Sequence, residues 1–223
     1  MAYRRTERVM QRLAARHDAI IVAARAIAAD TGMAAVQIAP VAERAGIAAG
    51  TVYRYFPAKT DLVAALVTAV SERELAALRR AADAAPGPLS ALAAAILTFA
   101  ARAVRNRRLA WSVMAEPVDA TVDAVRLTYR KALVTEFEAR ISAAVRGGHL
   151  PEQDVALVAP ALVGALLEGL IGPLARANGD DAASARASIQ MLALLSLRAL
   201  GVVDARARGL VVQTRLPAEE DAA

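Results

Sequence analysis

The sequence predicts an all-α protein of about nine or ten helices, and three observations support this prediction. Hydrophobic residues make up 57% of the 223 residues and aromatic residues only 4%, so Ala, Leu and Val dominate, which favours closely packed helices. Apolar residues recur three and four positions apart, as they do on one face of a helix. The only candidate strand is a short apolar run at 210–212.

Glycine and proline delimit the expected helices. Gly32 suits the left-handed residue after a helix C-terminus, Gly46 closes the second helix, and Pro57 is tolerated at the first position of the fourth. The clearest linker is Ala-Pro-Gly-Pro at 85–88. The helices are expected at residues 12–30, 38–45, 48–56, 57–84, 89–104, 107–115, 119–146, 155–175 and 182–200.

Residue counts exclude several kinds of site. The chain has no cysteine, which excludes disulfides, iron–sulfur clusters and a cysteine nucleophile. Its two histidines, His17 and His149, lie far apart in sequence, which excludes a multi-histidine metal site within one chain. The sequence contains no phosphate-binding glycine loop, nucleophile elbow or zinc-protease motif. We therefore expect no metal and no cofactor, and an enzyme is a minor alternative.

Positive charge is concentrated at the front of the chain. Residues 1–62 contain nine Lys/Arg and five Asp/Glu, a balance of +4, whereas the remaining 161 residues carry a balance of +1. A basic segment on a nearly neutral body predicts a polyanionic partner, either nucleic acid or anionic lipid. The alternative is an Arg-rich helix face that contacts only water.

The most apolar segment, 155–175, is long enough to span a membrane, but it contains Glu168, Pro160 and Pro173. A helix that is apolar nearly all round is equally suited to burial inside protein, and this is the interpretation we favour. The charged N-terminus lacks the apolar region of an export signal. We therefore expect a soluble, cytoplasmic protein with no membrane partner.

Residues 36–62 carry the signature of a helix-turn-helix. Two short amphipathic helices meet at a turn containing Gly46, with the small residues Ala42 and Ala45 at the closest contact and Ile47 beneath the turn. The second helix directs outward a set of small, hydroxyl-bearing, basic and aromatic side chains that suits a DNA major groove: Ala48, Ala49, Thr51, Tyr53, Arg54 and Tyr55.

From about residue 17 to residue 66 the chain resembles the N-terminal domain of the tetracycline-repressor (TetR) family. The resemblance implies a homodimeric transcription repressor that is released from a double-stranded DNA operator by a small molecule. Its domains would be a basic arm and DNA-binding domain at 1–62, a connecting helix at 63–85, a ligand-binding and dimerisation domain at 86–205, and a tail at 206–223. The matching residues are Val41, Ala42, Ala45, Gly46, Ile47, Gly50, Val52, Tyr53, Tyr55, Phe56, Lys59 and Leu62.

The resemblance also implies roles for single residues. Ala48 replaces a usual Ser and loses a helix cap worth about 1 kcal/mol, Ala49 stands where Lys is common, and Pro40 stands where Asp is common. We expect the basic arm, which begins with Arg4 and Arg5, to compensate by following the DNA backbone or entering a minor groove. Phosphate contacts are implied for Gln37, Tyr53, Tyr55 and Lys59, and groove-facing positions for Thr51 and Arg54.

The resemblance places a small apolar ligand within residues 89–203, where a few unusual side chains stand out from an Ala/Leu background. Glu116 is the expected polar anchor, although Glu116 and Glu168 could instead pair with an Arg such as Arg126 or Arg102. The alternative is a packed core with no ligand. The expected ligand-binding residues are Phe99, Trp111, Met114, Glu116, Tyr129 and Phe137.

The last two long helices are too apolar for a one-sided surface helix and predict a four-helix dimer interface. The alternative is an intrachain core. The expected interface residues are Val158, Leu162, Leu166 and Leu170 on one helix and Ile189, Leu192, Leu195 and Leu200 on the other. The sequence thus predicts a ligand-responsive, DNA-binding repressor, and the main alternative is a helical protein that binds a membrane surface or another protein.

Overall fold

The computed structural model describes residues 2–175 and 182–215, with side chains from residue 9 onward. All regular secondary structure in these ranges is helical, in agreement with the prediction. The front of the chain contains α1 (Ala2–Thr31), the short η1 (Met33–Ala35), α2 (Ile38–Arg44) and α3 (Ala49–Tyr55). The rest contains α4 (Lys59–Asp83), α5 (Pro88–Arg105), α6 (Arg107–Met114), α7 (Ala120–Arg146), α8 (Val155–Leu170), α9 (Ala182–Ala199) and α10 (Asp204–Gln213).

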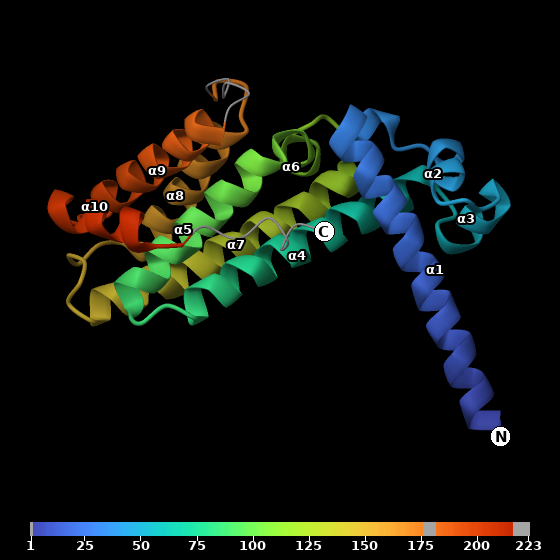
Figure 1. The fold of residues 1–223 in the computed structure, drawn as a ribbon, viewed down its shortest axis with the longest axis horizontal. Helices are drawn as coiled ribbons and strands as arrows, with labels where there is room; N and C mark the ends of the chain where they lie inside the picture. The colour runs from blue at the N-terminus through green and yellow to red at the C-terminus, as the bar shows by residue number, and fades with distance from the viewer. Residues whose placement is uncertain (1, 176–181, 216–223) are drawn as a thin grey trace.

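The described part of the molecule is elongated, and a different group of helices lies at each end. In Figure 1, α2 and α3 lie at one end, α8, α9 and α10 at the other, and α4, α5 and α7 run between them. α5 is rich in Ala, which lets α4, α7 and α9 approach it closely. Of the described helices, α5 alone is long and apolar enough to cross a membrane, and 78% of its apolar window is buried inside the protein.

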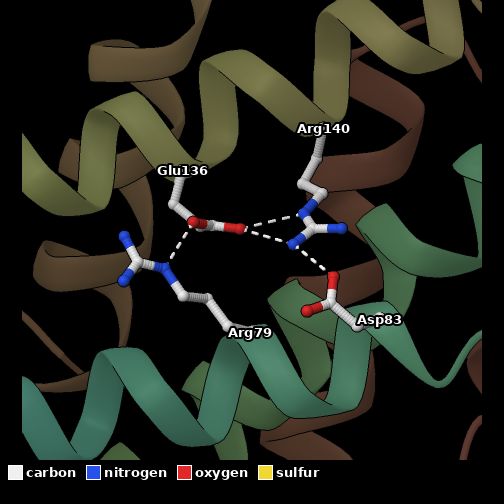
Figure 2. Close-up of polar contacts among 4 residues, drawn as sticks. All are labelled: Arg79, Asp83, Glu136 and Arg140. Carbon is white, nitrogen blue, oxygen red and sulfur yellow. Dashed lines mark hydrogen bonds and ion pairs between the residues drawn. The ribbon is translucent and has the colours of Figure 1, made fainter.

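A cluster of four charged residues fastens α4 to α7 (Figure 2). Arg79 of α4 donates to the carboxylate of Glu136 over 2.8 Å, and Arg140 donates to both Glu136 and Asp83 over 2.7 and 2.8 Å. Burial alone raises the pKa of Glu136, but the hydrogen bonds from Arg79 and Arg140 outweigh burial and hold the pKa below its ordinary value. The four charges balance, so these two helices are held in register by a neutral network.

The first helix is longer than expected. The sequence predicted a helix from residue 12 preceded by a basic arm, whereas α1 begins at Ala2. The residues before 12 include Ala, Arg, Gln and Glu, which are strong helix formers, and no Gly or Pro interrupts them. The first half of α1 projects away from the rest of the molecule, whereas its second half, with Ile20 and Ala24 fully buried, joins the core.

The structure adds one helix to the expected set and moves the bounds of two others. The candidate strand at 210–212 and the start of the expected tail lie in α10, where Ala207 and Val211, four positions apart, are buried. α8 ends at Leu170, before Gly172 and Pro173, rather than at residue 175. Pro57 precedes α4 instead of starting it.

Candidate nucleic-acid interface and ligand cavity

α2 and α3 form the helix-turn-helix that the sequence predicted. The turn passes through Gly46, whose φ of 66° lies in the left-handed region that glycine adopts without strain. The N–H of Ile47 donates to the carbonyl of Ala42 over 3.0 Å and closes the turn. Val41 of α2 and Val52 of α3 are both fully buried, so the two helices share one core.

The outer face of α3 is open to solvent. Tyr53 is 53% exposed, Arg54 is exposed and Thr51 is half-buried. Tyr55 is half-buried, and its ring centroid lies 6.5 Å from that of His17 on α1. This face therefore presents two accessible side chains that suit a groove or a phosphate, whereas Tyr55 also helps to seat α3 on α1.

The backbone around α3 leaves room for a close approach. A Cβ placed on Gly50 would meet nothing within 4 Å, so the packing of the free protein does not require a glycine there. Ala48, the residue before α3, offers no side-chain cap, as its sequence implied. Gln37 precedes α2, but its side chain donates to the carbonyl of Ala34 over 3.0 Å instead of capping the helix.

Further positive charge lies beside this face. Lys59 is the exposed first residue of α4, and Asp61 accepts a hydrogen bond from the N–H of Ala58 over 2.9 Å. Arg12 and Arg16 of α1 border a hollow that also contains the turn residues Gly46 and Ile47. Arg4 and Arg5 lie in the first turns of α1, and their side chains lie outside the described part of the structure.

A polar contact joins α6 to the turn between α1 and α2. The carboxylate of Glu116, just after α6, accepts hydrogen bonds from the N–H groups of Met33 and Ala34 over 2.8 and 3.1 Å. Ser112 donates to the same carboxylate over 2.7 Å, and Arg108 donates to the carbonyl of Thr31 over 2.7 Å. We call these contacts, between Arg108, Ser112 and Glu116 on one side and residues 31–34 on the other, the α1–α6 clasp.

The clasp constrains both of its partners. Burial alone raises the pKa of Glu116, but hydrogen bonds from Met33, Ser112 and Ala34 outweigh burial and hold the pKa below its ordinary value. Gly32 has a φ of 98°, and a Cβ there would lie 3.2 Å from the Glu116 carboxylate. The positive φ of this turn therefore favours glycine, and a side chain here would press against the Glu116 carboxylate.

The other side of α6 is fixed to α7 by a buried arginine. Arg126 donates to the carbonyls of Ser112, Val113 and Glu116 over 2.5 to 2.7 Å, so its cation caps the C-terminus of α6. Of the two arginines suggested as partners of Glu116, Arg126 thus binds its backbone carbonyl and not its carboxylate. The other suggested buried acid, Glu168, is exposed and accepts a hydrogen bond from the N–H of Leu174 over 3.2 Å.

A cavity lies between the second half of α1 and helices α4 to α7. It encloses about 50 Å³ of space that water can reach, and it is mostly apolar. Its lining residues are Arg25, Val70, Ser71, Glu74, Phe99, Arg102, Ala103, Arg105, Asn106, Leu109, Ala110, Val113, Met114, Tyr129 and Ile171.

The cavity brings together half of the residues predicted to bind a ligand. Phe99, Met114 and Tyr129 line it, but Trp111, Glu116 and Phe137 do not. Phe137 is fully buried in the core, and the carboxylate of Glu116 is engaged in the clasp. The polar lining residues Arg25, Ser71 and Glu74 were missed by the sequence analysis. A signal for them exists, because each interrupts the apolar face of a helix that is otherwise packed into the core.

The structure buries some of the predicted dimer residues and leaves others accessible. Leu162, Leu166, Leu170, Ile189 and Leu200 are buried within their own chain, so they are not available to a partner and that part of the prediction was wrong. Val158 and Leu192 are half-buried, and Leu195 is 58% exposed. The exposed apolar stripe on these two helices consists instead of Leu157, Ala161 and Gly164 on α8 and Ala187, Met191 and Leu195 on α9.

Comparison with known proteins gives a match at the front of the chain. Residues 20–66 match the family described as bacterial regulatory proteins, tetR family. The chain is 44% identical over 77 residues to the HTH-type transcriptional repressor KstR of Mycolicibacterium smegmatis, which covers 34% of this chain and 38% of that protein. It is 50% identical over 48 residues to KstR of Mycobacterium tuberculosis, with 22% of each chain covered. The chain thus aligns with well under half the length of these curated relatives.

Solved structures share the fold over nearly the whole chain. The crystal structure of RolR with resorcinol has a TM-score of 0.65 at 22% identity and covers 94% of this chain and 98% of RolR. The fatty acid degradation regulator FadR from Bacillus halodurans has a TM-score of 0.71 at 20% identity, with 84% and 97% covered. Residues 20–66 thus match the TetR family of bacterial regulatory proteins, and the fold of the whole chain is similar to that of TetR-like regulators.

Proposed function

We propose that the protein is a cytoplasmic transcriptional repressor that binds a pseudo-palindromic DNA operator as a homodimer and responds to a small, mostly apolar ligand. The observation that carries the proposal is the open face of α3, where Tyr53 and Arg54 are exposed beside the open position of Gly50. A helix with such a face fits the major groove, and we expect Lys59, exposed at the start of α4, to bind a phosphate. The two KstR proteins named above are themselves repressors, which supports this proposal.

Homodimerisation is supported by the exposed stripe on α8 and α9. Leu157, Met191 and Leu195 are 67%, 67% and 58% exposed, and they share these two helices with exposed small residues. Apolar side chains gathered on neighbouring helices favour association with a second copy of the same surface. Two α3 helices related by a two-fold axis would then face the same side of a DNA duplex.

Response to a ligand is supported by the position of α6. Leu109, Ala110, Val113 and Met114 of this helix line the cavity, and the clasp at its end holds the turn before the helix-turn-helix. A ligand that moves α6 therefore changes how the DNA-binding domain is held. Only a ligand with different affinities for the two arrangements releases the protein from DNA.

The test is selection of genomic DNA fragments by the purified full-length protein at physiological salt. We expect one pseudo-palindromic sequence to be enriched, with half-sites about one helical turn apart, roughly 34–36 Å, or modestly further. Anionic lipid vesicles at the same salt provide the competing surface. Enrichment of no sequence, together with vesicle binding that exceeds DNA binding, would contradict the proposal.

A further inference from the structure

The cavity has one polar end, and its chemistry is asymmetric. Arg102 of α5 donates to both carboxylate oxygens of Glu74 on α4, over 2.5 and 2.9 Å. Ser71 lies one turn before Glu74, Tyr129 reaches the same region from α7, and Arg25 reaches it from α1. The rest of the wall, mainly α6 and Phe99, is apolar apart from Arg105 and Asn106 at the junction of α5 and α6. A ligand that fills this space must therefore have one polar group and an apolar body.

The polar end offers hydrogen-bond donors. The hydroxyl of Ser71 is buried and has no hydrogen-bond partner within the described part of the chain, although buried hydroxyls are normally paired. Burial raises the pKa of Tyr129 above its ordinary value, so its hydroxyl keeps its proton and remains a donor. The carboxylate of Glu74, which also lines the wall, already accepts two hydrogen bonds from Arg102. An acceptor atom of a ligand would give the Ser71 hydroxyl a partner.

Positive charge exceeds negative charge in the same wall. Among the described residues, Arg25, Arg102 and Arg105 line the cavity together with a single acid, Glu74. Burial lowers the pKa of Arg25, and repulsion from Arg73 and Arg102 adds to this effect, while Glu74 opposes it. An anion near Arg25 would therefore be attracted by a partly buried cation that has more positive than negative neighbours.

We infer that the ligand of this cavity is a small organic carboxylate, with its anionic head at Arg25, Ser71 and Tyr129 and its apolar body against α6. This inference rests on the proposed function, because it names the ligand to which the regulator responds. Arg25 belongs to α1, so the head group would contact the DNA-binding domain directly.

The size of the cavity links binding to movement. An apolar cavity that holds benzene has a volume of about 150 Å³, whereas this one has about 50 Å³. A carboxylate with a ring or a chain of several carbons therefore enters only if part of the wall is displaced. The short helix α6 contributes much of the apolar wall and also carries the clasp.

The test compares acids with the primary alcohols of the same skeleton. Benzoate, 3-phenylpropionate and decanoate, and their three alcohols, are titrated calorimetrically into the full-length protein at neutral pH in the absence of DNA. We expect at least one acid to bind about tenfold or more tightly than its alcohol, because a charge-assisted hydrogen bond is much stronger than a neutral one. Equal affinity of acid and alcohol, or no binding of any acid, would overturn the inference.

Variants of the polar end sharpen the test. Arg25→Gln should weaken binding of the acid about tenfold and leave the alcohol unchanged. Glu74→Gln removes the negative charge that Glu74 contributes to the wall and should tighten binding of the acid severalfold, which a ligand of any other charge would not show. Ser71→Ala should weaken the acid without lowering the melting temperature, because the serine hydroxyl is unpaired in the free protein. Tightening of the alcohol by Glu74→Gln, or an unchanged acid affinity in Arg25→Gln, would contradict the proposed head-group site.

The outcome is independent of DNA. A protein that binds the acids but selects no DNA sequence would refute the proposed function and leave the ligand class intact. A protein that selects an operator but binds none of the acids would refute the ligand class alone.

Discussion

Arg54 and Lys59 should have different effects on DNA binding because one is on the open face of α3 and the other at the start of α4. Lys59→Ala should weaken binding to all sequences alike and flatten the dependence of log affinity on log salt by about one unit. Arg54→Ala should cost about 1–3 kcal/mol and relax the preference at one or two base pairs. Salt titrations and fragment selection measure both effects. Lys131→Ala, an exposed lysine of α7, is the matched control and should change neither. Full sequence preference in Arg54→Ala would remove Arg54 from base reading.

Glu116 should contribute to stability through the clasp. Glu116→Gln removes the charge and one of the two acceptor oxygens, so we expect a loss of about 1–2 kcal/mol in the free energy of unfolding. Hydrogen exchange at the N–H groups of Met33 and Ala34 should become faster. Glu138→Gln on α7 is the control, since that side chain is half-buried and lies outside the clasp. Unchanged exchange at both amides would show that the clasp does not hold the turn.

The same variant should change the response to acid. Because the pKa of Glu116 is lowered by folding, its contribution to stability is present above the ordinary value of 4.5 and is lost as the pH falls through the lowered pKa. The stability of the wild-type protein should therefore fall more steeply below that pH than the stability of Glu116→Gln. Denaturant unfolding at several acidic pH values measures the difference in slope.

At the scale of elements, α1 extends the positive surface beyond the helix-turn-helix. Val9, Met10 and Leu13 are exposed, so residues 9–13 of α1 add little to the core. Deleting residues 2–11 should leave the melting temperature nearly unchanged but weaken operator binding by more than about tenfold, because three arginines are lost. Replacing Arg4, Arg5 and Arg8 by Gln tests charge alone, with the helix kept. Operator affinity equal to that of the full chain at physiological salt would show that this segment is not used.

The helix-turn-helix was predictable from sequence because its contacts are local. Gly46, Ala42 and Ile47 meet within six positions, and their spacing alone specifies the turn. The clasp was not predictable, because Glu116 and Met33 are 83 positions apart and nothing in either segment marks the other. The sequence analysis identified Glu116 as an unusual acid and predicted that it anchors a ligand. Its partners in the structure are the N–H groups of Met33 and Ala34, which only the fold brings close to it.

At the scale of the whole molecule, the dimer should depend on the outer stripe of α8 and α9. Leu195→Arg places a charge on this exposed stripe and should give a folded monomer with much weaker operator binding. Leu127→Arg on α7, at a leucine 52% exposed, is the matched control and should remain dimeric. Sedimentation at micromolar concentration measures the state of each. A wild-type monomer, or a dimeric Leu195→Arg, would contradict the assigned interface.

The inner and outer faces of α8 explain why the sequence analysis chose interface residues that the chain itself buries. Leu162 and Leu166 are large and apolar, which is as typical of a dimer interface as of a core. The outer face carries Leu157 among alanines and glycines and gives a weaker signal. Which face meets the chain's own core is settled by the packing of α7 and α9 against α8, and no local pattern records that packing.

Substitution of Gly50 should have opposite effects on the stability of the free protein and on its affinity for DNA. With open space around its Cβ position, Gly50→Ala should raise the stability of α3 by up to ~1 kcal/mol, because alanine is the better helix former. The same methyl group would stand between α3 and any DNA backbone drawn close to it. Gly50→Ala should therefore raise the melting temperature and lower the operator affinity. The control is Gly209→Ala, at an equally open glycine of α10, which should raise the melting temperature and leave the operator affinity unchanged. The free protein would therefore be more stable with alanine at position 50, and only the DNA complex would favour glycine there.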